Sequence, residues 1–175
     1  MKVKKPKCQT CECRDHAWAR TTQWGTALVS IEDSHWLESF SWCLLVPKQG
    51  YAYARSAHSL VNSTLHVAIM PNVEMVDHKN GNGLDCRRIN IRKASRGQNR
   101  INVKTEPRAR SGYRGVFFNT SGRGPKWKSG IRINKITKHL GYFDDPEQAA
   151  RVYDLAAHAA FGEFARLNFP IVADF

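Results

Sequence analysis

Hydrophobic and polar residues alternate most clearly in the last third of the chain. Alternation over residues 113–119, 126–134 and 137–143 predicts three strands. A glycine-rich turn at 119–125 joins the first two, and a tight turn at Lys135-Ile136 joins the second and third. The short connections predict an antiparallel sheet.

A helix is expected to follow these strands. Asp144-Asp145-Pro146-Glu147 combines an acidic N-cap, a proline in the first turn and a further acid, which together favour a helix start. Apolar side chains then recur on one helical face, at positions 149, 150, 153, 156, 157 and 160. Most of them are alanines, so the helix can lie close against the sheet, and Gly162 is a suitable end.

Side-chain parity separates the two faces of the second strand. Trp127, Ile131 and Ile133 share the parity that should face the helix, so we interpret Trp127 as a core residue. The opposite parity is polar and basic, and it carries Lys126, Lys128, Arg132 and Asn134. A three-stranded sheet with such an outer face can enter the major groove of DNA.

The first two thirds of the chain predict short strands and one helix. Residues 26–70 are expected to form short strands, most clearly at 27–31 and 50–55, and residues 93–103 a short polar helix. The expected fold class is therefore α+β. The expected organisation is a cysteine-containing N-terminal segment at 1–25, a domain at 26–104, a linker at 105–111 and a second domain at 112–170.

Charge points to a polyanionic partner. The 175 residues carry a formal net charge of +12, which suits double-stranded DNA, although structured RNA is also compatible with it. Basic residues are most frequent between Lys79 and Arg110, where only Asp85 and Glu106 oppose them. The run is either a solvated helix face or a phosphate-contacting surface. We expect three of its members to contact DNA: Arg87, Arg88 and Arg96.

Membrane association is not expected. The sequence shows no lipidation motif and no basic amphipathic helix, and its longest apolar stretches, such as 42–47, are too short to span a bilayer. No apolar core follows the basic N-terminus, so the sequence predicts a soluble, cytoplasmic protein that is not secreted.

The cysteines favour reduced thiols over a disulfide framework. There are five, an odd number, and no secretion signal accompanies them. Cys8, Cys11, Cys13 and His16 are four soft ligands within a short stretch and could close a structural zinc site. Their spacing is tighter than in common zinc fingers, so free thiols on the N-terminal segment are the alternative.

One dipeptide, Asp77-His78, offers a metal ligand and a general base side by side. Phosphodiester hydrolysis needs a base that deprotonates water and a cation that stabilises the leaving oxygen. The string from Val76 to Asn99 resembles the HNH homing-endonuclease family, which often reads Val-Asp-His, Asn-Gly, Leu-Asp-Asn-Arg, Asn-Leu-Arg and Gln-Asn. Cys86 stands where that family commonly has asparagine, and Ile91 where leucine is usual.

This resemblance implies a ββα-metal site with one Mg²⁺ or Mn²⁺ ion. It implies that Asp77 and Asn99 are metal ligands and that His78 is the general base. It implies that Asn90 fixes the intervening loop through backbone hydrogen bonds. His66 occupies a position where the family usually has histidine, and it either packs in the structure or contacts phosphate.

The region from Ser111 to Pro170 resembles the ethylene-response-factor (AP-two type) DNA-binding domain. The matching motifs include Tyr113-Arg-Gly-Val, Leu140-Gly-Tyr-Phe and Leu167-Asn-Phe-Pro. The resemblance implies that Arg114 and Arg132 contact DNA, and His139 lies at a DNA-facing position. Residues usually charged and DNA-facing in that family are replaced here by Phe117, Asn119 and Gly130, so its target sequence is not carried over.

Together these resemblances imply a DNA endonuclease of the homing type, in which the second domain extends the footprint on DNA. They imply a phage or mobile-element source, and a monomer on DNA, with a dimer left open. Cleavage could nick one strand or break both. A non-catalytic DNA-binding regulator with a decayed nuclease domain is the alternative.

Overall fold

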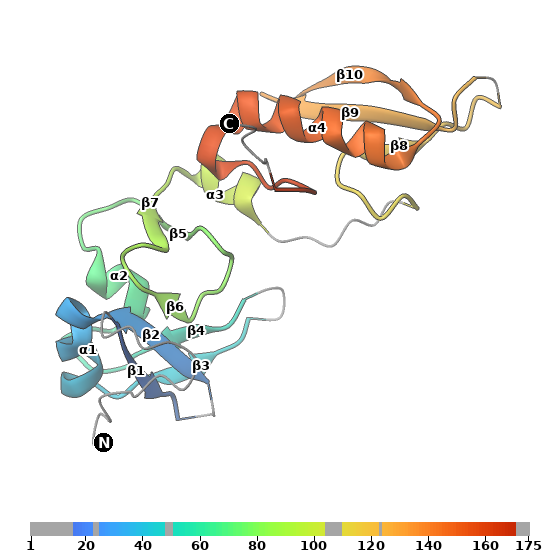
Figure 1. Ribbon diagram of the computed structural model, residues 1–175. Coiled ribbons are helices and arrows are strands. Elements are labelled where there is room, and N and C mark those ends of the chain that lie inside the picture. Colours follow the sequence, from blue (N-terminus) through green and yellow to red (C-terminus); the bar gives the residue numbers. More distant parts are fainter. Residues whose placement is uncertain (1–15, 23–24, 48–50, 104–109, 123, 171–175) are drawn as a thin grey trace, which may run out of the picture. The chain divides into compact units, whose positions relative to one another are not determined.

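The computed structural model describes residues 16–22, 25–47, 51–103, 110–122 and 124–170 (Figure 1). Contacts divide the chain into two compact units, Met1–Asn99 and Arg100–Phe175, here called unit 1 and unit 2. The finer boundaries expected at 26–104 and 112–170 stay predictions. Residues 105–109 of the expected linker lie outside the described residues, as does residue 104.

The first sheet of unit 1 contains β1 (His16–Arg20), β2 (Thr26–Ser30) and β6 (Asp85–Cys86), in the order β1-β2-β6. β1 and β2 are antiparallel, whereas β6 runs parallel to β2. In β2, Val29 is fully buried and pairs with Cys86. This pairing brings a segment from the middle of the chain into the core built by its start.

Two short helices lie where alternation predicts strands. They are α1 (Ser34–Ser39) and α2 (Leu65–Ile69), so the prediction of strands is wrong at these two places. Burial of apolar side chains stabilises both helices. Leu37 of α1 is buried, and so are Leu65 and Ile69 of α2. Neither helix is long enough to show a helical period in the sequence.

A hairpin and a 3-10 turn complete this part of the unit. The turn, η1 (Ile31–Asp33), leads into α1, and β3 (Cys43–Leu45) pairs antiparallel with β4 (Tyr53–Arg55). Trp42 precedes β3 and is 1% exposed, and its indole Nε1 donates to the Trp36 carbonyl at 2.8 Å. The largest fully buried side chain therefore has its polar atom satisfied.

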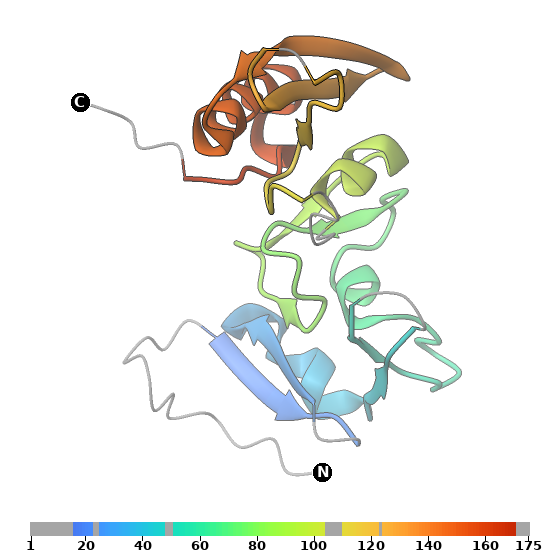
Figure 2. The same ribbon diagram turned by 90° about the vertical axis from the view of Figure 1, so that its right-hand side faces the viewer.

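Two further strands of unit 1, β5 (Val76–His78) and β7 (Ile91–Lys93), form an antiparallel pair, and α3 (Arg96–Asn102) follows β7 (Figure 2). The helix expected at 93–103 therefore starts later than predicted, because β7 is held in the ladder with β5. Between β5 and β7 the chain passes through β6, which belongs to the first sheet.

The sheet of unit 2 has three antiparallel strands, β8 (Val116–Phe118), β9 (Trp127–Ile133) and β10 (Ile136–Phe143), in the order β10-β9-β8. Asn134 and Lys135 form the tight turn, with φ angles of 51° and 68°. Positive φ at both central residues suits the twist of a two-residue hairpin. The turn lies one residue earlier than expected.

Helix α4 (Pro146–Phe161) packs across this sheet, as the sequence predicts (Figure 1). The Asp145 carboxylate caps the helix by accepting from the two backbone N–H groups of Glu147 and Gln148, at 3.0 and 3.4 Å. Ala149 and Ala150 are fully buried with Val116 of β8, because alanine lets helix and sheet approach closely. The helix ends before η2 (Gly162–Phe164).

The fold class is α+β, with several small sheets and helices. None of the helices in the described ranges combines the length and the apolar character needed to cross a membrane.

Gly115 should be the most sensitive glycine of unit 2. Its φ is +76°, and a Cβ there would collide with the ring of Tyr153, whereas Gly122 has a similar φ of +70° and open space around it. Gly122→Ala should cost about 1 kcal/mol from backbone strain alone. Gly115→Ala should cost about 1–3 kcal/mol more, because it adds overpacking. Urea unfolding of both variants measures the difference, and equal losses would contradict the predicted contact.

Candidate active site and nucleic-acid interface

Asp77 lies in the middle of β5 and is buried, with only 4% exposed. It stands directly opposite Arg92 in the β5–β7 ladder. Arg92 Nε lies 2.9 Å and Nη2 lies 2.8 Å from the same carboxylate oxygen, Oδ2. Both side chains are buried, so the ion pair is shielded from water and the carboxylate has a cation beside it.

His78 ends β5 and has different neighbours, because successive side chains in a strand point to opposite faces. Its Nε2 lies 3.8 Å from Cys86 Sγ, and its ring meets the ring of His66 edge-on, with centroids 4.8 Å apart. Burial lowers the pKa of His78, although the negative charges of Asp77 and Asp85 oppose the shift. The imidazole is therefore neutral at neutral pH and can accept a proton.

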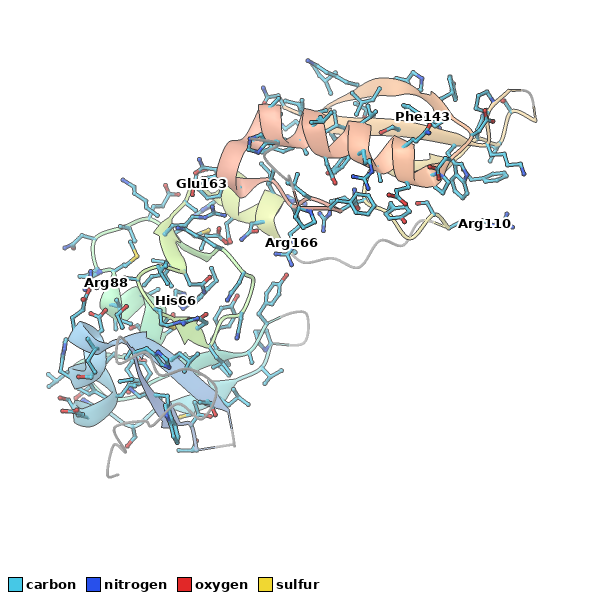
Figure 3. The ribbon with its side chains drawn as sticks, viewed as in Figure 1. His66, Arg88, Arg110, Phe143, Glu163 and Arg166 are labelled. Atoms are coloured by element: carbon cyan, nitrogen blue, oxygen red, sulfur yellow. The ribbon has the colours of Figure 1, made fainter. Side chains whose placement is uncertain are left out.

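His66 comes from α2 and completes this group (Figure 3). Its Nε2 lies 3.2 Å from the Thr64 hydroxyl, while its Nδ1 is buried without a hydrogen-bond partner among the described residues. Burial, and secondarily the neighbouring His78, lowers the pKa of His66 to about 3. Burial also raises the pKa of the Cys86 thiol.

Asn90 holds the loop between β5 and β7. Its side-chain Oδ1 accepts from the Asn80 backbone N–H at 3.0 Å, and its Nδ2 donates to the Asp85 carbonyl at 2.7 Å. The Asn80 amide in turn donates to the Asp85 carboxylate at 3.0 Å. Asn90 is buried near the end of the loop, so its two bonds tie that end to the start of the loop and to β6 without competition from water.

Asn99 lies on α3, near the start of β5. Its Nδ2 is 3.1 Å from the sulfur of Met75, and the Met75 carbonyl accepts from the Ala94 backbone N–H at 3.0 Å. Helix α3 and the residues before it are therefore hydrogen-bonded to Met75, which lies two residues before Asp77. The amide and carboxylate oxygens of Asn99 and Asp77 are hard donors of the kind that Mg²⁺ and Mn²⁺ prefer.

The three arginines expected to contact DNA in this segment have different surroundings. Arg87 binds the Asp85 carboxylate in two contacts of 2.7 and 2.8 Å. This contact, with the Asn80 hydrogen bond, lowers the pKa of Asp85 even though burial alone would raise it. Arg88 (Figure 3) binds buried Asp33 in two contacts of 2.8 Å. The side chain of Arg96 is 84% exposed.

In unit 2, the basic face expected on the sheet is exposed. Lys126, Lys128, Arg132 and Asn134 are all exposed, as is His139 on β10. On the same strand as Lys128, Ile131 is 2% exposed and Trp127 packs against the core, in agreement with the predicted parity. Phe143 (Figure 3), at the end of β10, also packs against that core.

Arg114 lies partly buried in unit 2. Its Nη2 donates to the Val103 carbonyl at 3.3 Å, and its backbone N–H donates to the Asn168 side chain at 2.7 Å. Asn168 is itself held by the buried carboxylate of Asp154. The backbone at Arg114 is therefore fixed by a buried polar network.

Most of the candidate zinc ligands near the N-terminus lie outside the part of the chain that the structure describes. These are Cys8, Cys11 and Cys13. His16 is buried at the start of β1.

Two contacts at the site are missing from the sequence prediction. One is the pairing of Asp77 with Arg92, which the ladder register would have indicated had the strand pair been recognised. The other is the grouping of His66, His78 and Cys86, whose ligand atoms lie within 4.8 Å of one another. No sequence spacing indicates this group, because its members come from α2, β5 and β6.

The comparisons agree with two parts of the sequence prediction. Over 147 residues the chain is 29% identical to an uncharacterized HNH endonuclease of Acanthamoeba polyphaga mimivirus, and the match covers 81% of this chain and 74% of the viral protein. Over 60 residues it is 45% identical to an ethylene-responsive transcription factor of Arabidopsis thaliana, covering 33% of this chain and 30% of that protein. No family model and no solved structure matches.

The low pKa of His66 predicts an acid-sensitive unit 1. The unfolded chain takes up a proton at this residue below about pH 6.5, whereas the folded unit does so only near pH 3, so the free energy of unfolding falls as the pH drops between these values. The slope for one proton is at most about 1.4 kcal/mol per pH unit. His66→Gln cannot titrate, so it should lose less stability from about pH 7 to about pH 5. Urea unfolding at several pH values tests this, and parallel curves for the two proteins would contradict it.

Proposed function

We propose that this chain is a metal-dependent DNA endonuclease of the HNH homing type. One observation carries the proposal: His78, which is buried, follows the buried Asp77 at the end of a strand. The strand lies in the segment that resembles the HNH family, and the viral relative with that name supports the same activity. We also propose, from the resemblance to homing endonucleases, that the gene belongs to a phage or another mobile element.

Asp77 and Asn99 fit a hard divalent ion. They offer a carboxylate and an amide oxygen, which are donors that such an ion prefers. These two residues would hold Mg²⁺ or Mn²⁺, and the ion, when bound, stabilises negative charge on the phosphate and on the leaving oxygen.

His78 is the general base in this proposal. A neutral imidazole nitrogen takes a proton from water as the water oxygen bonds to phosphorus and the bond to the leaving oxygen breaks. Burial keeps His78 neutral, and the ring of His66 restricts its orientation. Asn90 positions the loop that follows, and so acts on the site without touching the substrate.

Unit 2 is proposed to bind the major groove of double-stranded DNA. The exposed residues of the sheet supply positive charge and hydrogen-bond donors, and the relative named as a transcription factor supports DNA binding by this part of the chain. Arg114, Lys126, Lys128, Arg132 and His139 are the proposed contacts. Arg87, Arg88 and Arg96 are the proposed contacts of unit 1, and we propose that a monomer binds DNA.

A non-catalytic DNA-binding regulator is the second candidate. Two observations favour it: Arg92 already contacts the Asp77 carboxylate, and Cys86 contacts His78. Such a protein would bind DNA without cutting it, so cleavage and binding measured on the same sample separate the two functions.

Removal of His78 should slow cleavage strongly. With Mg²⁺ or Mn²⁺, the wild-type chain should nick or linearise supercoiled DNA that includes its own genomic locus. His78→Ala should be slower by about 10²- to 10⁴-fold, because it loses the general base. His35→Ala, which removes an exposed histidine of the same unit, is the matched control and should cut normally. If the wild type fails to cut with either metal, yet binds DNA tightly, the regulator is the correct reading.

DNA binding by the outer face of the sheet can be tested with two variants, one that removes a charge from this face and one that removes a charge from α4. Arg132→Ala removes a proposed phosphate contact, and Arg151→Ala removes the same charge from the exposed face of α4, where Arg151 pairs with Glu147. Arg132→Ala should weaken DNA binding and reduce the slope of log affinity against log salt by about 1. Arg151→Ala should leave that slope nearly unchanged. Equal effects in a salt titration would mean that DNA binds elsewhere.

A further inference from the structure

His66, His78 and Cys86 form a compact group of soft donors in unit 1. One nitrogen of each imidazole and the thiol sulfur lie within 4.8 Å of one another. They come from α2, β5 and β6, so the tertiary structure brings them together. Nitrogen and sulfur donors select Zn²⁺ over Mg²⁺, and this set shares no residue with the oxygen donors Asp77 and Asn99.

One pair of atoms in this group is spaced nearly as it would be in a zinc site. Zn–N and Zn–S bonds in a tetrahedral site put a nitrogen and a sulfur about 3.6 Å apart. Nε2 of His78 and Sγ of Cys86 are already 3.8 Å apart. A small closure around an ion would therefore be enough to bond both atoms.

One member of the group has an unsatisfied atom. His66 Nδ1 is buried and has no hydrogen-bond partner in the described part of the chain. A buried polar atom in this state costs free energy, and a bond to a metal ion would remove that cost. Packing holds the other side of the group in place, since Cys86 is fully buried on β6.

We propose that His66, His78 and Cys86 bind Zn²⁺, and that the bound ion inhibits cleavage. The ion would take one nitrogen from each imidazole and the thiolate sulfur, with water in the fourth position, and the thiol proton would pass to solvent. An imidazole of His78 bonded to zinc no longer serves as a general base. The inhibitory half rests on the proposed function, whereas the binding half does not.

Cobalt tests binding directly, because a Co²⁺ ion bonded to a thiolate shows a charge-transfer band in the near ultraviolet. The full chain with Cys8→Ser, Cys11→Ser and Cys13→Ser removes the other candidate thiolates near the N-terminus. This variant should keep the band, and Zn²⁺ should displace the Co²⁺. Absence of the band from this variant overturns the proposal.

A matched pair of cysteine variants then identifies the ligand. In the same background, Cys86→Ala should lose the band or weaken metal affinity at least about tenfold. Cys43→Ala removes a half-buried thiol outside the group and should change neither. An unchanged band in Cys86→Ala would assign the metal to other residues and overturn the proposal.

Inhibition is measured as the ratio of the nicking rates with and without Zn²⁺. Nicking with millimolar Mg²⁺ is followed with and without micromolar Zn²⁺, and each protein is compared with its own zinc-free rate. The wild type should slow at least about tenfold and recover with a zinc-selective chelator, whereas Cys86→Ala should slow much less. Metal binding without inhibition contradicts the inhibitory half. A chain that binds Co²⁺ but never cuts with Mg²⁺ contradicts the proposed nuclease function and leaves zinc binding supported.

Discussion

The buried amide of Asn90 is the contact on which the candidate site depends. In the loop between β5 and β7, this one side chain bonds to the backbone of Asn80 at the start and of Asp85 near the middle. Those strands pair over only three residues each, and so short a pair needs support from outside its ladder. With the loop closed, Asp77 is held opposite Arg92, and β6 is held against β2, which brings Cys86 beside His78.

Strand geometry gives the two neighbouring residues of the candidate site separate surroundings. Asp77 pairs with Arg92 and is a proposed ligand of a hard metal ion. His78, by contrast, lies beside the imidazole of His66 and the thiol of Cys86. Hard ions and soft ions would therefore act on different atoms of one dipeptide. If both proposals hold, Mg²⁺ and Zn²⁺ have opposite effects on the same enzyme, and the concentration of free zinc sets its activity.

The sequence predicts unit 2 well because local signals decide its structure. The structure contains three features that the sequence predicts: the buried and exposed faces of β9, the N-cap of α4 at Asp145, and the packing of the alanine face of α4. The α+β class is also confirmed. Unit 1 is harder to predict, because α1 and α2 are too short for a visible period and are fixed by burial of single residues such as Leu37. The His66 group is invisible in the sequence for the same reason: only tertiary packing assembles it.

The most direct test of the central claim, that Asp77 and Asn99 hold the metal beside His78, is to locate the ion. Crystals of the full chain with a DNA duplex and Mn²⁺ would show the ion by its anomalous scattering. We predict a Mn²⁺ peak bonded to oxygens of Asp77 and Asn99, with a phosphate oxygen of the DNA beside it. A peak bonded only to the His66, His78 and Cys86 group, or no peak in unit 1 of a DNA-bound chain, would contradict the claim.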